Sequence, residues 1–99
     1  SAVKTNEAIV ASAWSSFLSN QSLLSSVEAQ VRAAEIANEG ITAEYESGVG
    51  RTTLDVIQSN SLLLNALITR ADSERNLILS QFNLLKSIGL LNSDHLKIN

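Results

Sequence analysis

The sequence predicts an all-α protein, a long antiparallel two-helix coiled-coil hairpin followed by a short C-terminal helix. First, the 99 residues contain no proline, the residue that most strongly disrupts a helix interior, at about 3 kcal/mol. Second, apolar residues recur at alternating steps of three and four over two long stretches, which is typical of helices that pack along a seam. Third, the two stretches are separated by one short segment that contains two closely spaced glycines, Gly48 and Gly50.

Composition limits the class of protein before any motif is considered. The formal net charge is -3 and cysteine is absent, which argues against nucleic acid as a partner and against a disulfide framework or thiolate metal site. Serine, aspartate and histidine occur, but no segment resembles a nucleophile elbow, and a two-helix hairpin offers no pocket that excludes water. His95 has no second ligand at metal-binding spacing. We therefore expect no enzyme activity, no metal and no other cofactor.

The first helix is expected over residues 6–47. Its predicted seam is Leu24, Val27, Val31, Ala34, Asn38, Ile41 and Tyr45, and the same spacing continues toward the N-terminus through Val10, Trp14 and Phe17. A polar seam residue such as Asn38 usually fixes the register between helices at a cost in stability; the alternative is that it lines a wet tunnel. Gly40 costs about 1 kcal/mol relative to Ala inside a helix, so we expect it to mark a close contact with another helix.

The second helix is expected over residues 53–90, with Gly89 ending it and a short tail over 92–99 forming the final helix. Its predicted seam consists of Ile57, Leu64, Ala71, Ile78 and Leu85, with Leu54, Ile68 and Phe82 in the partner row. A further apolar row, on another face, consists of Val56, Leu63, Leu77, Leu84 and Leu91. A two-helix hairpin covers one seam per helix, so the surplus row predicts assembly with other helices.

The segment 48–52 is the predicted turn at the tip of the hairpin. Glycine tolerates positive φ without steric cost, so Gly48 and Gly50 suit positions just past a helix end. Thr52 and Asp55 have the spacing of a capping box, in which the side chain of each residue bonds the backbone N–H of the other. Arg51 and Asp55 are four residues apart, so the structural expectation for Arg51 is a local ion pair.

Residues 43–48 (AEYESG) and 51–57 (RTTLDVI) resemble the periplasmic tip of the TolC family of outer-membrane efflux and secretion channels. Members typically show a Tyr-x-x-Gly-x-Arg-Thr-x-x-Asp-Val-Leu pattern there. Residues 29–35 and 83–91 are similar to the helices that lead into and out of that hairpin. The resemblance covers nearly all of this chain but only the second, C-terminal hairpin of the family's full-length proteins. We therefore expect a fragment of a longer protein, one piece of an α-helical barrel.

The resemblance implies a role in export, either multidrug efflux or type I secretion. In such proteins three protomers pool their hairpins into a tunnel through the periplasm, so the implied location is the outer membrane with this part in the periplasm. The tip forms the pore entrance and docks the hairpin of a periplasmic adaptor, also called a membrane fusion protein, which links the channel indirectly to an inner-membrane transporter. The alternative hypothesis is a stand-alone coiled-coil interaction module, for which the tip is only a stable turn.

The resemblance also implies roles for individual residues. The implied adaptor-binding residues are Gly48, Val49, Gly50, Thr52, Thr53 and Leu54, and the implied gate or latch residues are Tyr45, Arg51, Asp55 and Gln58. The spacing from Tyr45 to Arg51 is one residue longer than in the family pattern, which leaves Gly48 and Gly50 as alternatives for the adaptor contact. Gln58 stands where some members carry a second aspartate. For Asp55 the structural alternative is helix capping, and for Tyr45 it is packing in the seam.

Overall fold

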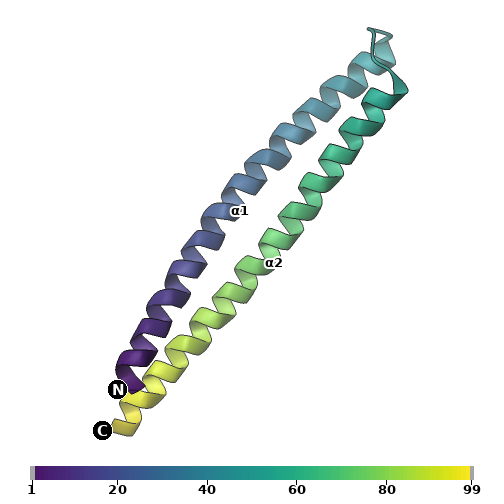
Figure 1. Cartoon of the computed structure of the whole chain (residues 1–99). Coiled ribbons are helices and arrows are strands. Elements are labelled where there is room, and N and C mark those ends of the chain that lie inside the picture. The colour runs from purple at the N-terminus through teal and green to yellow at the C-terminus, as the bar shows by residue number, and fades with distance from the viewer. Residues whose placement is uncertain (1, 99) are drawn as a thin grey trace. The chain divides into compact units, whose positions relative to one another are not determined.

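The chain forms two long helices, α1 (Ala2–Ser47) and α2 (Thr53–Ile98), joined by the turn at residues 48–52 (Figure 1). The computed structural model describes the backbone of residues 2–98 and the side chains of residues 2–93. No strand occurs among these residues. The predicted all-α helical hairpin is thus confirmed. Within the described part of the chain, neither helix has a segment long and apolar enough to cross a membrane.

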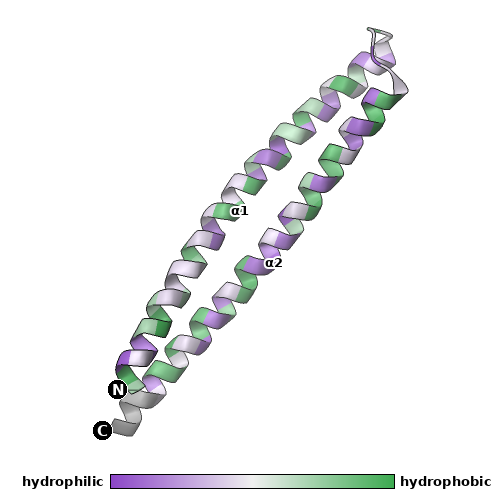
Figure 2. Cartoon of the chain, in the orientation of Figure 1, coloured by the Kyte–Doolittle hydropathy of each residue, from purple (hydrophilic) through white to green (hydrophobic). Residues whose placement is uncertain are grey.

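The chain divides into two compact units, each built from one stretch of α1 and one stretch of α2. The tip unit comprises residues 24–73 and contains the turn, and the base unit comprises residues 1–23 and 74–99. In each unit the two helical stretches run antiparallel, and apolar residues recur along both of them (Figure 2). The candidate functional site lies entirely in the tip unit.

The seam of α1 follows the predicted row. Val27 and Val31 are 4% and 1% exposed, and Leu24, Ala34, Asn38 and Ile41 are half-buried. Tyr45, at the end of the row, is 42% exposed. In the base unit Val10 and Phe17 are half-buried, but the buried neighbour is Ala13, not the predicted Trp14, which is 51% exposed and packs against the Phe17 ring at 5.8 Å between centroids.

The row of α2 that packs against α1 is the one predicted to be surplus, and the row predicted to form the seam is exposed. Ile57, Leu64, Ile78 and Leu85 are each at least half exposed. The covered row combines large residues with small ones at heptad spacing: Val56, Leu63, Leu77, Leu84 and Leu91, and Ser59, Ala66, Ser73, Ser80 and Ser87. Because α1 fills the seam with Val, Leu and Phe side chains, a facing row that alternates large and small residues packs without overfilling it.

The second helix does not end at Gly89, so the prediction of a separate short C-terminal helix is wrong. Gly89 has no positive φ, and the covered row lies on both sides of it, with Ser87 before it 4% exposed and Leu91 after it half-buried. This continued packing offsets the cost of about 1 kcal/mol for a helical glycine. At the other end α1 begins at Ala2, four residues before the predicted start. The side chain of His95 lies outside the described residues.

Polar seam residues link the two helices of the tip unit. The Asn38 side-chain amide donates to Ser59 Oγ at 3.0 Å and to Asn60 Oδ1 at 2.7 Å. This pair of bonds fixes one register between α1 and α2, as expected for a polar residue in a seam. Ser73 differs from the other serines in the covered row of α2, because its hydroxyl is buried and has no hydrogen-bond partner among the described residues.

Candidate functional site

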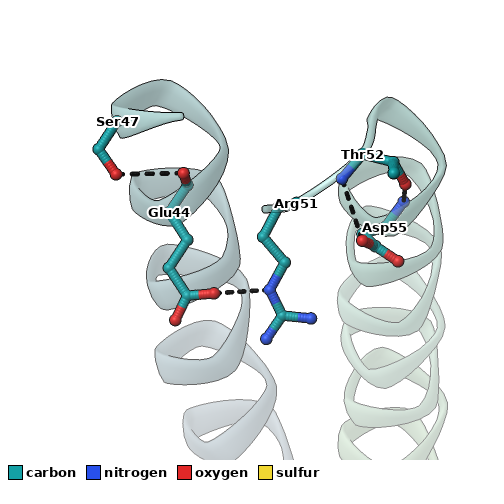
Figure 3. Close-up of polar contacts among 5 residues, drawn as sticks. All are labelled: Glu44, Ser47, Arg51, Thr52 and Asp55. Atoms are coloured by element: carbon teal, nitrogen blue, oxygen red, sulfur yellow. Dashed lines mark hydrogen bonds and ion pairs between the residues drawn. The ribbon is translucent and has the colours of Figure 1, made fainter. Parts of the chain in front are cut away.

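Helix α1 ends in a Schellman motif. The Gly48 N–H donates to the Tyr45 carbonyl at 3.2 Å, and the Val49 N–H donates to the Glu44 carbonyl at 3.0 Å. These are the two characteristic bonds of the motif, and they require a left-handed residue at the first position past the helix. Gly48 supplies it with a φ of 78°. The Ser47 hydroxyl also donates to the Glu44 carbonyl, at 3.1 Å (Figure 3).

Gly50 is the second left-handed residue of the turn, with a φ of 76°. A Cβ added at Gly48 or Gly50 would meet no atom within 4 Å. The two glycines are therefore required by backbone conformation and not by lack of space inside this chain. Both predicted candidates for the adaptor contact consequently present open surface, and the geometry does not favour one over the other.

The predicted capping box opens α2. The Thr52 N–H donates to Asp55 Oδ2 at 3.0 Å, and the Asp55 N–H donates to Thr52 Oγ1 at 3.2 Å (Figure 3). The bond from the Thr52 N–H is the main reason that the pKa of Asp55 lies below its ordinary value, and the positive end of the helix dipole favours the same charged form. Asp55 thus completes the capping box of α2, whose N-cap is Thr52, in agreement with the structural alternative of a capping role.

Arg51 pairs across the turn instead of along α2. Its Nε–H donates to Glu44 Oε2 at 2.6 Å (Figure 3). The hydrogen bond and charge of Glu44 raise the pKa of Arg51, and Asp55 makes the smallest of the contributions. The expected local ion pair with Asp55 is therefore replaced by an ion pair that joins the last turn of α1 to the turn at residues 48–52. Glu44 is the site residue that the sequence reasoning missed, because a partner across a turn cannot be read from helical spacing.

Tyr45 makes a second link across the turn. Its hydroxyl lies 3.1 Å from the Thr53 hydroxyl, which joins the last turn of α1 to the first turn of α2. Together with the Schellman motif, the capping box and the Arg51–Glu44 pair, this contact defines the conformation of the whole tip. The structure thus brings Tyr45, Arg51 and Asp55 together within the turn and its two flanking helix ends.

Gln58 lies one helical turn beyond Asp55, beside a groove of about 290 Å³ on the tip unit. The groove is lined by Ala34, Ala37, Ile41, Arg51, Asp55, Gln58, Ser59 and Leu62. Three of the four predicted gate residues therefore share one concave surface, with a wall of apolar residues from α1. The spacing of the two alanines on α1 is a signal that sequence reasoning could have used to place this wall.

The predicted adaptor-binding residues, in the turn and at the start of α2, are all exposed. Val49 is 67% exposed and Leu54 is 60% exposed, while Thr52 and Thr53 use their side chains in contacts within the tip. In many Schellman motifs the residue at the Val49 position packs back on the helix. Here its counterpart on the helix is Glu44, which is engaged with Arg51. The apolar surface of Val49 thus remains available for contact.

The fold and site together define a helical-hairpin module with a structured, exposed tip. A comparison with curated proteins finds the outer membrane efflux protein BepC of Brucella suis biovar 1 (strain 1330), which is 29% identical over 87 residues. The alignment covers 88% of this chain and 19% of BepC, so the chain spans about a fifth of that relative. No protein-family model and no solved structure matches significantly. The similarity to BepC agrees in general terms with the resemblance to TolC-like channels.

Proposed function

We propose that this chain is a wall segment of the periplasmic tunnel of a trimeric outer-membrane export channel. In this proposal its tip docks a periplasmic adaptor and forms part of the pore entrance. The observation that carries the proposal is a turn that is held by hydrogen bonds within the tip while it presents apolar side chains outward. The similarity to a protein described as an outer membrane efflux protein supports the same assignment.

A preformed turn favours docking because little conformational entropy is lost on binding. Val49 and Leu54 supply the apolar contact area. Fully burying an aliphatic side chain of this size contributes about 1.5–3 kcal/mol relative to leaving it exposed. The backbone at Gly48 and Gly50 has no Cβ, so a partner helix can approach it closely.

The gate proposal rests on Arg51 and its neighbours. Within the described residues only the Nε–H of Arg51 is bonded, so its Nη groups can serve a second acceptor. Asp55 and Gln58 lie beside the same groove. The Arg51–Glu44 pair is 41% and 47% exposed, and exposed ion pairs are held weakly. A latch built from such a pair opens when a partner offers competing contacts.

The second apolar row of α2 supports the wall assignment. Ile57, Leu64 and Ile68 are each more than half exposed, and they lie roughly 150° around the helix from the seam at 100° per residue. A helix with apolar rows on opposite sides can contact a neighbour on each side. A helix in the wall of a tunnel has this requirement.

Site-directed cross-linking tests the proposal directly, because the chain has no native cysteine. Val49→Cys and Leu54→Cys place a thiol on the tip, and Leu79→Cys is the matched control, since Leu79 is 57% exposed and lies in the base unit. In cells that also contain a periplasmic adaptor, a thiol-reactive cross-linker should join the adaptor to both tip variants and not to the control. Equal labelling of all three variants, or none at the tip, would contradict adaptor docking and favour a stand-alone coiled-coil module.

The contact glycine can be identified with substitutions that keep the turn. Leucine at Gly48 or Gly50 would strain a φ near +77°, so lost binding would not separate contact from folding. Asparagine tolerates the left-handed region and still adds a side chain. We expect adaptor cross-linking to fall in only one of Gly48→Asn and Gly50→Asn, with helicity unchanged by circular dichroism. An unchanged yield in both variants would show that neither glycine is the contact.

A further inference from the structure

One heptad of the covered row of α2 is polar. At five of the large positions of this row the side chain is apolar: Val56, Leu63, Leu77, Leu84 and Leu91. Between them stands Arg70, which is half-buried at the position that a leucine takes one heptad earlier and one heptad later. The small position of the same heptad is Ser73, which is 4% exposed. We call Arg70 and Ser73 the polar heptad; both belong to the tip unit, at its end away from the turn.

The polar heptad contributes less to the seam than a heptad of leucine and bonded serine. Arginine can bury its aliphatic stem, but its charged head keeps contact with water or a polar group, so it removes less apolar surface from water than leucine does. The buried Ser73 hydroxyl has no hydrogen-bond partner among the described residues. Such a group loses its hydration on folding without a compensating bond, and it regains that hydration when the helices separate.

The serines of the base unit behave differently from Ser73. Ser80 Oγ donates to the Leu77 carbonyl at 2.7 Å, and Ser87 Oγ donates to the Asn83 carbonyl at 2.8 Å. Both bonds lie within α2, so neither has to break when α2 separates from α1. The two hydroxyls are satisfied in the closed state and in the open state alike.

The tip unit, in contrast, has side-chain bonds that join its two helices. The Asn38 amide donates to Ser59 Oγ and to Asn60 Oδ1 across the seam. The Tyr45 and Thr53 hydroxyls join the two helix ends at the turn. These bonds are lost when α1 and α2 of the tip unit separate. Opening the tip unit therefore costs polar contacts that the serine bonds of the base unit do not supply.

Chain connectivity makes the base unit depend on the tip unit. The two stretches of the base unit, residues 1–23 and 74–99, are connected through the 50 residues of the tip unit. While the tip unit is folded, this connection is fixed. If the tip unit were unfolded, forming the base unit would require closing a long flexible loop, which costs entropy. The tip unit needs only its own short turn, so it can remain folded when the base unit opens.

We propose that the polar heptad divides the hairpin into two cooperative units, so that the helices of the base unit separate and re-form while the tip unit stays folded. The boundary of the opened region lies at Ser73, because opening to this level hydrates its hydroxyl. The turn, the capping box and the Arg51–Glu44 pair keep their conformation in the partly open state. The inference concerns contacts inside one chain and does not depend on the proposed function.

Native-state hydrogen exchange of the 99-residue chain tests this division. Exchange is followed by NMR at one fixed low chain concentration and increasing urea below the unfolding transition, at Val31 and Leu63 in the tip unit and Phe17 and Leu84 in the base unit. Separated helices are marginal in water, so their amides exchange. Corrected for intrinsic rates, the base amides should exchange at least tenfold faster than the tip amides, with a weaker dependence on urea because less surface is exposed. Equal rates with equal urea dependence at all four amides would overturn the inference.

Restoring the seam tests the role of the polar heptad itself. The double variant Arg70→Leu/Ser73→Ala makes the heptad apolar, and the difference in exchange rate between base and tip amides should fall below threefold because the base amides exchange more slowly. Arg75→Leu is the matched control, since it makes the same change at an exposed position outside the covered row. The control should keep the tenfold difference. A difference that persists in the double variant, or that disappears equally in Arg75→Leu, would overturn the inference.

Discussion

Loss of the α2 N-cap should destabilise the chain measurably through a single oxygen atom. In Thr52→Ala the hydroxyl that accepts the Asp55 N–H at 3.2 Å is removed, while the backbone bond from the Val56 N–H to the Thr52 carbonyl can remain. Removing a threonine N-cap costs about 1 kcal/mol, with a range of roughly 0.5–2. For a chain of this size that corresponds to a fall in melting temperature of about 4–8 °C.

Thermal unfolding followed by circular dichroism at one fixed chain concentration is the appropriate assay, because self-association would shift the apparent stability. Thr52→Ser is the first control, since it keeps the oxygen and should retain most of the stability. Thr69→Ala is the second, because Thr69 is exposed within α2 and donates only to the Asn65 carbonyl of its own helix. There the better helix propensity of alanine should leave stability unchanged or slightly higher. A loss no larger in Thr52→Ala than in Thr69→Ala would refute the capping argument.

Three further predictions follow from other contacts of the described residues. The pKa of Asp55 is lowered in the folded chain, so the contribution of the Asp55 carboxylate to stability is present above the ordinary pKa of about 3.9 and is lost as pH falls through the lowered pKa. Asp55→Asn should remove this part of the acid dependence of the free energy of unfolding, measured in denaturant titrations. An unchanged acid dependence would contradict the prediction. Ser73→Ala removes a buried hydroxyl that has no partner among the described residues, and it should raise the free energy of unfolding by up to about 1 kcal/mol. Ser59→Ala removes one acceptor of the Asn38 amide and should lower the free energy of unfolding. Equal effects of the two substitutions would refute this difference between Ser73 and Ser59. Val31→Ala empties the most deeply buried position, 1% exposed, and should cost about 2 kcal/mol in urea unfolding, so a loss below about 0.5 kcal/mol would argue against this seam.

The sequence was sufficient where only one interpretation of a pattern was physically available. Helix α1 has a single strong apolar row, so its seam from Leu24 to Ile41 could be assigned from spacing alone. The turn was equally local: positive φ at Gly48 and Gly50, and the Thr52–Asp55 box, depend on residues within a few positions of one another. Local geometry of this kind is encoded in residue type.

The sequence was insufficient where two interpretations differed only in packing. Helix α2 carries two heptad rows, and hydrophobicity favoured the row of Ile57 and Leu64 as the seam over the mixed row of Val56 and Ser59. The seam instead takes the mixed row, because facing side chains must share a fixed volume and α1 is already bulky there. The same limit applies to Gly89, where a local stop signal is outweighed by seam packing on both sides.

From its sequence alone this protein is a helical hairpin with a capped glycine turn, since the absence of proline, the heptad spacing and the turn residues act over short distances. Only the tertiary structure decided which face of α2 meets α1, that Arg51 pairs with Glu44, and that Gly40 faces open space. Those features depend on which side chains share volume or reach one another across the turn, and such contacts join residues whose separation in sequence carries no periodic signal.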